Sequence, residues 1–282
     1  MFGKLIGAMV TPFNNDDEID YEVVLELLKR YEDSGHSAIV ICGSTGESTS
    51  LTIGEKIDLL EFCLQHSDLK IIMGICENDT KKAISEIELF APYRPHGFLL
   101  VVPYYNKPPQ RGIFLHFKKC ALAANHIPII VYNVPSRTCS HIELVTLKKL
   151  MKVNKNIVGI KEATNDFSFM ASIKKALPKC LVYYGNDKDF LKALQSGADG
   201  IISVSSIIYG EEYKLLITDY DDGFINRLLA DYLSFIGGLI SLESNPIPIK
   251  YLLKKNGVGS MNLRLPLVEL SGDNQRVMDI LA

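Results

Sequence analysis

Short apolar runs alternate with longer amphipathic segments along residues 5–204. The repeat is roughly 30 residues long, the size of a strand, a helix and their connections. Some short runs, such as 38–41, are apolar at every position, which is typical of parallel strands that helices cover on both faces. The pattern predicts eight strands, over residues 5–10, 38–41, 70–74, 97–102, 127–132, 157–161, 181–184 and 200–204.

The segments between these strands have the spacing of amphipathic helices. Apolar residues recur three and four positions apart in 20–32 and in 53–65. Eight strands, each followed by a helix, predict an α/β protein with the (β/α)8 or TIM barrel fold. A doubly wound sheet is the alternative, but it would have a glycine-rich turn after its first strand. Here Thr11, Pro12 and Phe13 follow that strand, and the sequence contains no G-x-G-x-x-G.

The pattern changes after residue 204, where no further strand is evident. Residues 224–242, 246–255 and 275–281 have helical patterns, separated by Asn-Pro, Asn-Gly and Leu-Pro pairs. No linker rich in Gly, Ser or Pro precedes them. The sequence therefore predicts a catalytic barrel over 1–209 and a C-terminal helical extension over 210–282 that packs directly on it.

Composition and charge exclude several classes of protein. Of 282 residues, 47% are hydrophobic, and 30 Lys and Arg against 33 Asp and Glu give a net charge of −3. This balance excludes a disordered chain and the basic surface of a nucleic-acid-binding protein. We expect no membrane span, because no run of about 18 apolar residues occurs. The N-terminus does not resemble a signal peptide, so we expect a cytoplasmic protein.

The cysteines and histidines have no metal-binding pattern. The six cysteines are widely spaced, without a C-x-x-C or zinc-finger spacing, and the six histidines include no H-E-x-x-H. We expect free, buried thiols and no metal site.

Lys161 is the first candidate for chemistry, because active sites of barrels lie at the carboxyl ends of the strands. It ends the predicted strand 157–161, so its amine should enter the mouth of the barrel. Lowering the pKa of such an amine by about 3 units costs roughly 4 kcal/mol and gives a neutral amine near neutral pH. A neutral amine can form a Schiff base with a carbonyl substrate. The alternative is a structural ion pair with a carboxylate such as Glu162.

Other candidates follow neighbouring strands. Tyr132 could transfer protons during imine formation or simply line the barrel. Arg137 has a fork suited to a carboxylate or phosphate, although it could be a surface loop residue. Ser44 and Thr45 lie in a turn that could bind a carboxylate or cap a helix. The Pro-rich loop 103–109 has adjacent tyrosines, suited to binding or to an interface.

Together these segments resemble the dihydrodipicolinate synthase family of pyruvate-dependent class I aldolases. The motifs occur in family order along almost the whole chain. They are Gly-Ser-Thr-Gly-Glu (43–47), Pro-Tyr-Tyr-Asn (103–106), Tyr-Asn-Val-Pro-Ser-Arg-Thr (132–138), Gly-Ile-Lys-Glu-Ala-Thr (159–164), Asn-Pro-Ile-Pro (245–248) and Leu-Arg-Leu-Pro (263–266).

The resemblance implies a lyase that condenses pyruvate with aspartate semialdehyde in lysine and diaminopimelate biosynthesis. Lys161 would hold pyruvate as an imine, so no dissociable cofactor is implied. Tyr132 would relay protons with Thr45 and with Tyr105 of a neighbouring subunit, and Arg137 would bind the carboxylate of the semialdehyde. The resemblance also implies a homotetramer built as a dimer of dimers, and a pocket lined by the backbone at Gly185 and Ile202.

The sequence departs from the family pattern in two ways, and the first departure leaves alternative functions open. Ser44 replaces the first of two threonines, which keeps the hydroxyl but loses a methyl contact. The Gly-Ser-Thr-Gly-Glu form is also similar to N-acetylneuraminate lyase, so that enzyme and a 2-keto-3-deoxy sugar acid aldolase are alternatives. Arg137 in Pro-Ser-Arg-Thr favours the synthase. A catalytically silent keto-acid or lysine sensor is a further alternative, but a sensor would not need an imine-forming lysine.

The second departure concerns feedback by lysine. The family's lysine-binding histidines and acid correspond here to Ile53, Lys56 and Lys82, whereas Ser48, Asn78 and Tyr104 remain. The ammonium group of a lysine ligand would meet Lys82, a repulsion of around 1 kcal/mol or more. We therefore expect weak or absent inhibition by lysine.

Overall fold

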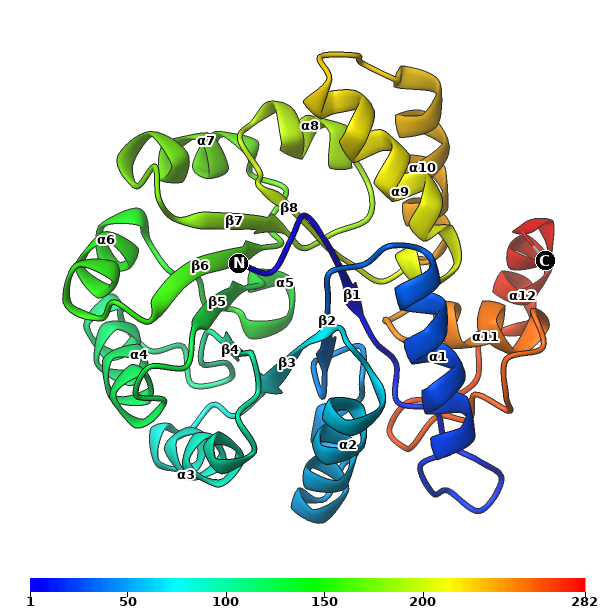
Figure 1. Ribbon diagram of the computed structural model, residues 1–282, viewed down its shortest axis with the longest axis horizontal. Coiled ribbons are helices and arrows are strands. Elements are labelled where there is room, and N and C mark those ends of the chain that lie inside the picture. The colour runs from blue at the N-terminus through cyan, green and yellow to red at the C-terminus, as the bar shows by residue number, and fades with distance from the viewer. Residues whose placement is uncertain (282) are drawn as a thin grey trace.

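The computed structural model describes residues 1–281, and its centre is a closed barrel of eight parallel strands in the order of the sequence (Figure 1). Every predicted strand is confirmed, with ends that differ by at most two residues. The strands are β1 (Leu5–Ala8), β2 (Ala38–Ile41), β3 (Lys70–Ile75), β4 (Gly97–Val101), β5 (Ile129–Asn133), β6 (Ile157–Glu162), β7 (Leu181–Tyr184) and β8 (Gly200–Ser203).

Helices cover the outside of the barrel, and local sequence signals start several of them (Figure 1). The Asp20 side chain accepts a hydrogen bond from the backbone N–H of Val23 at the start of α1, and Thr52 and Glu55 form a reciprocal capping box at the start of α2. The helices of this part of the chain are α1 (Tyr21–Asp33), α2 (Ile53–His66), α3 (Thr80–Phe90), α4 (Gln110–Ala123), α5 (Pro135–Thr138), α6 (Leu144–Val153), α7 (Phe167–Ala176), α8 (Phe190–Gln195) and α9 (Ser206–Asp221).

Side chains of alternate strand residues fill the inside of the barrel. Ile6, Val40, Ile72, Ile130 and Ile202 are buried there in one hydrophobic cluster. Their neighbours along the strands pack outward against the helices in a second, larger cluster. This alternation follows from the two-residue period of a strand, so the interior is a packed core and only its carboxyl-terminal end can hold a site.

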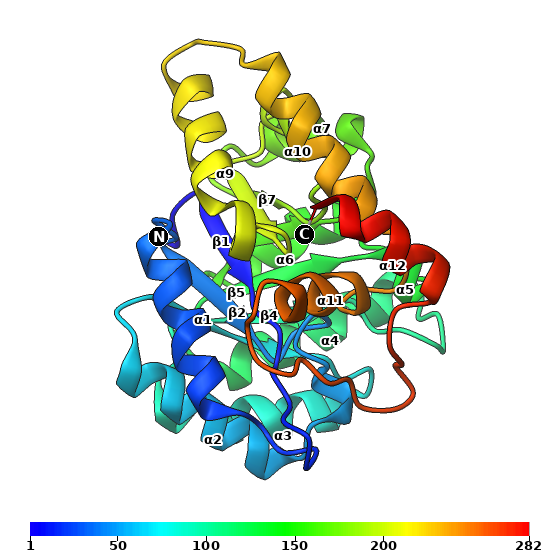
Figure 2. The ribbon, with the colours of Figure 1, turned by 90° about the vertical axis from the view of Figure 1, so that its right-hand side faces the viewer.

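The C-terminal extension lies on one side of the barrel, as both views show (Figures 1 and 2). It comprises α10 (Arg227–Leu239), α11 (Ile247–Lys255) and α12 (Gly272–Met278), followed by a 3-10 turn at Asp279–Leu281. The helical segments predicted after residue 224 are confirmed, although α12 begins three residues before the predicted 275. None of the helices within residues 1–281 has the length and apolar character needed to cross a membrane.

The helix α9 follows β8, as eight strands each followed by a helix predict, but its residue range was not predicted. It packs against β1, α1 and α10, and its backbone bends at Tyr209. The boundary expected between residues 209 and 210 coincides with this bend. The division of the chain into 1–209 and 210–282 stays a prediction, because buried residues before and after the bend belong to the same hydrophobic cluster.

All six cysteines are free, as expected, but they are not all buried. Four are buried and Cys76 is half-buried. The expectation is wrong for Cys139, which is exposed. Cys139 follows the short helix α5 directly, and its side chain lies on the surface rather than in the core.

Candidate active site

Lys161 and Tyr132 lie side by side inside the mouth of the barrel. They are paired residues of the neighbouring strands β6 and β5, so both side chains point to the same face of the sheet. The Nζ atom of Lys161 is 4.6 Å from the centre of the Tyr132 ring. Only 6% of Lys161 and 7% of Tyr132 are exposed, so water has little access to either group.

Burial lowers the pKa of Lys161 to about 8. The nearby negative charge of Asp187 opposes this decrease, whereas the positive charge of Arg137 adds to it. The ion pair with Glu162 considered above does not form. The Glu162 carboxylate instead accepts hydrogen bonds from the Asn133 Nδ2 and the Thr164 backbone N–H, both at 2.8 Å. Lys161 is therefore a buried amine that deprotonates far more easily than a surface lysine.

Burial has the opposite effect on Tyr132 and raises its pKa to about 12. The charge of Arg137 and the Ser44 side chain partly offset this increase. The phenol thus stays protonated at neutral pH, and it can donate its proton and accept one in return rather than act as a permanent phenolate.

The turn at residues 43–47 follows β2 and brings two hydroxyls to the site. Thr45 is buried, and its Oγ1 accepts a hydrogen bond of 2.8 Å from the Nδ2 of Asn245. Ser44 is half-buried. Neither caps a helix, because the following 3-10 turn begins after Glu47 without a side-chain hydrogen bond. The capping alternative for this turn is wrong.

Glu47 fixes the turn to the C-terminal extension. Its carboxylate is fully buried and forms an ion pair of 2.5 Å with Lys250 of α11. The same carboxylate accepts the backbone N–H of Arg264 at 3.1 Å. Lys250 follows the motif at 245–248, and Arg264 belongs to the motif at 263–266. Both motifs therefore lie close to the contacts that hold the 43–47 turn in place.

A cavity of about 370 Å³ opens above Lys161 at the carboxyl ends of the strands. A second cavity of about 250 Å³ adjoins it, and Arg137 and Asn245 line both. Five predicted site residues line the first cavity: Thr45, Tyr132, Arg137, Lys161 and Gly185. The second cavity contains Ser44.

Two predicted residues lie elsewhere. Ile202 is completely buried in the barrel interior on β8, and Val204, two residues further along, lines the cavity in its place. Tyr105 is 86% exposed on the loop after β4 and lines neither cavity. A single chain therefore does not bring Tyr105 to Lys161.

Gly185 allows the backbone after β7 to approach Lys161 closely. A Cβ atom at this position would lie 3.0 Å from the Lys161 Cε and 2.8 Å from the Ala163 Cβ. Its backbone N–H donates to the carbonyl of Glu162 at 2.8 Å. Any larger residue would displace the stem of Lys161.

Asp187 is a buried cavity residue that the sequence analysis missed. Its carboxylate accepts hydrogen bonds from the Ser203 hydroxyl and from the backbone N–H groups of Val204 and Ser205, the last two at 3.1 and 3.3 Å. The available signal was an acidic residue three positions after a barrel strand, where catalytic groups of this fold occur.

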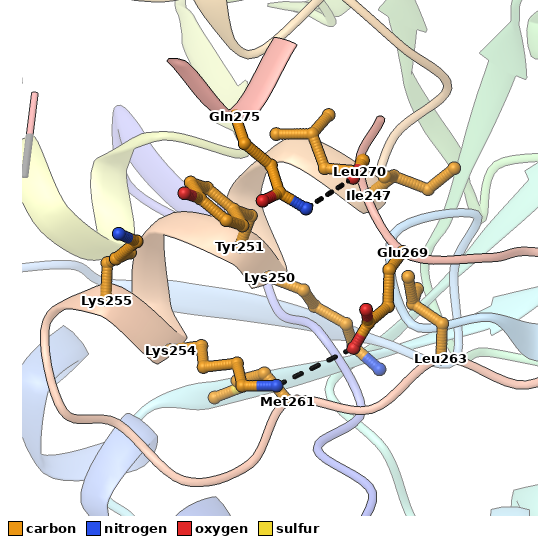
Figure 3. Close-up of a pocket in the computed structure, with 10 residues that line it drawn as sticks. All are labelled: Ile247, Lys250, Tyr251, Lys254, Lys255, Met261, Leu263, Glu269, Leu270 and Gln275. Carbon is orange, nitrogen blue, oxygen red and sulfur yellow. Dashed lines mark hydrogen bonds and ion pairs between the residues drawn. The ribbon is translucent and has the colours of Figure 1, made fainter. Parts of the chain in front are cut away.

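A third cavity of about 240 Å³ lies on the C-terminal extension (Figure 3). It contains none of the predicted site residues. Lys254 lies 3.7 Å from Glu269 there, and the Gln275 side chain donates to the carbonyl of Leu270. Lys250 also lines this cavity, although its amine pairs with Glu47.

The chain is similar to known proteins over almost its whole length. The model of the family described as "Dihydrodipicolinate synthetase family" matches residues 1–282. The chain is 38% identical to 4-hydroxy-tetrahydrodipicolinate synthase of Aquifex aeolicus over 280 residues, which cover 98% of this chain and 95% of the relative. It is 36% identical to the enzyme of that name from a Nostoc species over 277 residues, covering 96% and 94%.

Solved structures of proteins with these names have the same fold as this chain. A 4-hydroxy-tetrahydrodipicolinate synthase from Methylacidiphilum fumariolicum is 33% identical with a TM-score of 0.94, covering 99% of this chain and 94% of its own. A dihydrodipicolinate synthase from Thermotoga maritima is 32% identical with a TM-score of 0.95, covering 100% and 97%.

Proposed function

The chain belongs to the dihydrodipicolinate synthetase family and has 4-hydroxy-tetrahydrodipicolinate synthase activity, and we propose that Lys161 performs it by forming an imine with pyruvate. The observation that supports this role most strongly is the buried amine of Lys161, 4.6 Å from the Tyr132 ring in a cavity at the barrel mouth. The activity is that of a lyase of lysine biosynthesis.

The neutral amine of Lys161 attacks the keto carbon of pyruvate, and loss of water gives the imine. Loss of a methyl proton then gives an enamine, whose carbon bonds to the aldehyde carbon of L-aspartate 4-semialdehyde. The aldehyde oxygen takes up a proton to become a hydroxyl. The amino group of the second substrate finally displaces Lys161 from the imine carbon and closes the ring, so the lysine is regenerated.

The neighbouring side chains have matching roles. Tyr132 and Thr45 transfer protons during imine formation, because both hydroxyls lie in the cavity with Lys161. Backbone amides of the 43–47 turn, with the Ser44 hydroxyl, bind the carboxylate of pyruvate. The exposed guanidinium of Arg137 binds the carboxylate of the semialdehyde.

Trapping the imine tests this function. Borohydride reduction with pyruvate should add a pyruvyl group that peptide mapping locates on Lys161, and the Lys161→Ala variant should fold, form no adduct and lose nearly all turnover. An adduct on another residue, or no adduct in the unsubstituted protein, would contradict the role of Lys161. Parallel assays with sialic acid and 2-keto-3-deoxy sugar acids should give far lower rates than aspartate semialdehyde.

Tyr105 completes the site from a neighbouring subunit of a homotetramer, a dimer of dimers. The exposure of Tyr105 and its absence from the cavity of its own chain support this assignment. Subunits with Tyr105→Phe and subunits with Lys161→Ala should each have low activity, and mixing them should restore part of it. In a mixed dimer one site has both Lys161 and a neighbour's Tyr105. Failure to recover activity in mixed dimers verified by mass spectrometry would contradict the shared site.

A further inference from the structure

Asn245 connects the C-terminal extension to two residues of the proposed site. It lies between α10 and α11 and lines both cavities above the barrel. Its side-chain Nδ2 donates to the Thr45 Oγ1 at 2.8 Å, and its backbone carbonyl accepts a hydrogen bond of 3.3 Å from the Arg137 Nη2. One residue from a distant part of the sequence thus contacts both the hydroxyl and the guanidinium of the site.

The direction of the hydrogen bond to Thr45 determines where the Thr45 proton can point. A hydroxyl has one hydrogen to donate and two lone pairs that accept. Because the amide group of Asn245 occupies a lone pair, the hydrogen of Thr45 stays available for another acceptor. Within residues 1–281 that hydroxyl donates to no protein group, so Tyr132 or a bound substrate can receive its proton.

A second observation indicates that the Asn245 side chain serves a ligand as well as the fold. Its Oδ1 atom is buried and has no hydrogen-bond partner within the described chain. Such an orphaned acceptor destabilises the protein unless a donor satisfies it. Most buried polar atoms in proteins are paired, and this oxygen belongs to a residue that lines both cavities. The second substrate of the proposed reaction has an amino group that can donate to this oxygen.

We propose that Asn245 is a positioning residue for proton transfer, which holds the Thr45 hydroxyl with its hydrogen directed at Tyr132 and the bound substrates. This inference rests on the proposed function, because Thr45 is one of the groups that transfer protons in the proposed reaction. Asn245 acts through Thr45 and does not itself exchange a proton with the substrate.

The isosteric variant Asn245→Asp tests the proposal. A carboxylate can only accept, so the Thr45 hydroxyl would donate to it and turn its hydrogen away from the site. We expect kcat to fall about 10- to 100-fold, the scale of a disturbed proton transfer. The pH profile of kcat should also change, because the new carboxylate favours the protonated form of nearby Lys161. Asn245→Ala should slow turnover too, without the change in pH profile.

A double-mutant cycle with Thr45→Ala separates positioning from a general structural role. If Asn245 acts through Thr45, Asn245→Ala should cost less than about threefold in kcat once the hydroxyl is gone, because it adds no charge near Lys161. Asn262→Ala is the matched control in the same extension. The Asn262 side chain donates to the carbonyl of Asn14 at 2.9 Å and lines neither active-site cavity. It should lower Tm and leave kcat unchanged.

The outcomes distinguish this inference from the proposed function. An unchanged kcat and pH profile in Asn245→Asp, or an undiminished loss of kcat from Asn245→Ala on top of Thr45→Ala, would overturn the positioning role. If neither Asn245 variant folds, Asn245→Ser is tested instead, and its rate of borohydride trapping is measured. An unchanged rate in this variant would likewise overturn the positioning role. Failure of the unsubstituted protein to form the Lys161 adduct would instead contradict the proposed function.

Discussion

Burial is the main cause of the difference between the pKa of Lys161 and that of a surface lysine. Because its pKa in the folded protein is about 8, the neutral amine becomes the main form above that pH. We therefore expect the rate of pyruvate imine formation to rise with pH and to reach half of its maximum near pH 8. Borohydride trapping at a series of pH values measures this rate. A midpoint near 10.5, the ordinary value for lysine, would show that the amine is solvated.

Gly185 is the residue whose missing side chain makes room for Lys161. In Gly185→Ala the new Cβ atom would lie 3.0 Å from the Lys161 Cε, so the amine would shift within the cavity. We expect at least a tenfold loss of kcat, because misplacement by about 1 Å can cost a hundredfold. Overpacking should also destabilise the fold by about 1–3 kcal/mol.

Gly238→Ala is the matched control for this substitution. Gly238 lies in α10, and a Cβ atom there would meet nothing within 4 Å. The change should leave kcat unaltered and add up to about 1 kcal/mol of stability through helix propensity. Equal activity of the two alanine variants in steady-state assays would show that close packing at Gly185 does not position Lys161.

At the scale of elements, the turn 43–47 depends on a buried ion pair with α11. Glu47 and Lys250 are both almost completely buried, and their side chains meet at 2.5 Å. Removing one partner leaves the other charge unpaired, so Glu47→Gln or Lys250→Met should destabilise the protein by about 3–5 kcal/mol. Denaturant unfolding measures the change.

Replacing both members of this pair provides the control. The double variant Glu47→Gln, Lys250→Met removes both charges and should recover much of the lost stability, since buried pairs and apolar replacements are often nearly equivalent. If the single variants unfold at the same denaturant concentration as the unsubstituted protein, the pair does not fasten α11 to the turn.

The elements differ in how well the sequence predicted them. Strands such as β2 and β4 are apolar throughout and short, so their local composition alone identifies them. The residue range of α9 was not recognised because the helix bends at Tyr209 and buries residues before and after the bend, which interrupts a simple helical period. Its partners α1 and β1 lie at the other end of the sequence.

For the molecule as a whole, the structure gives a second reason to expect weak feedback by lysine. The buried amine of Lys56 forms an ion pair of 2.6 Å with the buried carboxylate of Glu86. This carboxylate therefore already has a cationic partner and is not free to pair with the ammonium group of a lysine ligand. Lys82 is exposed on α3. The expected repulsion of about 1 kcal/mol lowers the affinity for a lysine ligand about fivefold.

Initial rates at increasing L-lysine concentrations test this prediction. We expect little inhibition, and Lys82→Glu should increase it because the ammonium group of the ligand would then meet a carboxylate. Lys81→Glu is the control, since it changes the net charge of the same helix at the neighbouring position. Strong inhibition of the unsubstituted protein below millimolar lysine would contradict the prediction.

The sequence by itself determined the barrel, its strands to within two residues at each end, and the candidates Lys161, Tyr132, Thr45 and Arg137. Strand composition and alternation are local properties, and the carboxyl ends of parallel strands meet in one place whatever the loops do. Lys161 and Tyr132 were therefore predictable as neighbours once β5 and β6 were recognised.

Only the tertiary structure decided which distant groups support that site. Asn245 meets Thr45 across 200 positions of sequence, and Lys250 meets Glu47 across 203. The pKa of Lys161 likewise depends on burial and on Asp187, which a separate strand and loop bring to the cavity. Contacts of this kind depend on how loops and the C-terminal helices pack in space, and the periodicity of the sequence does not encode that packing.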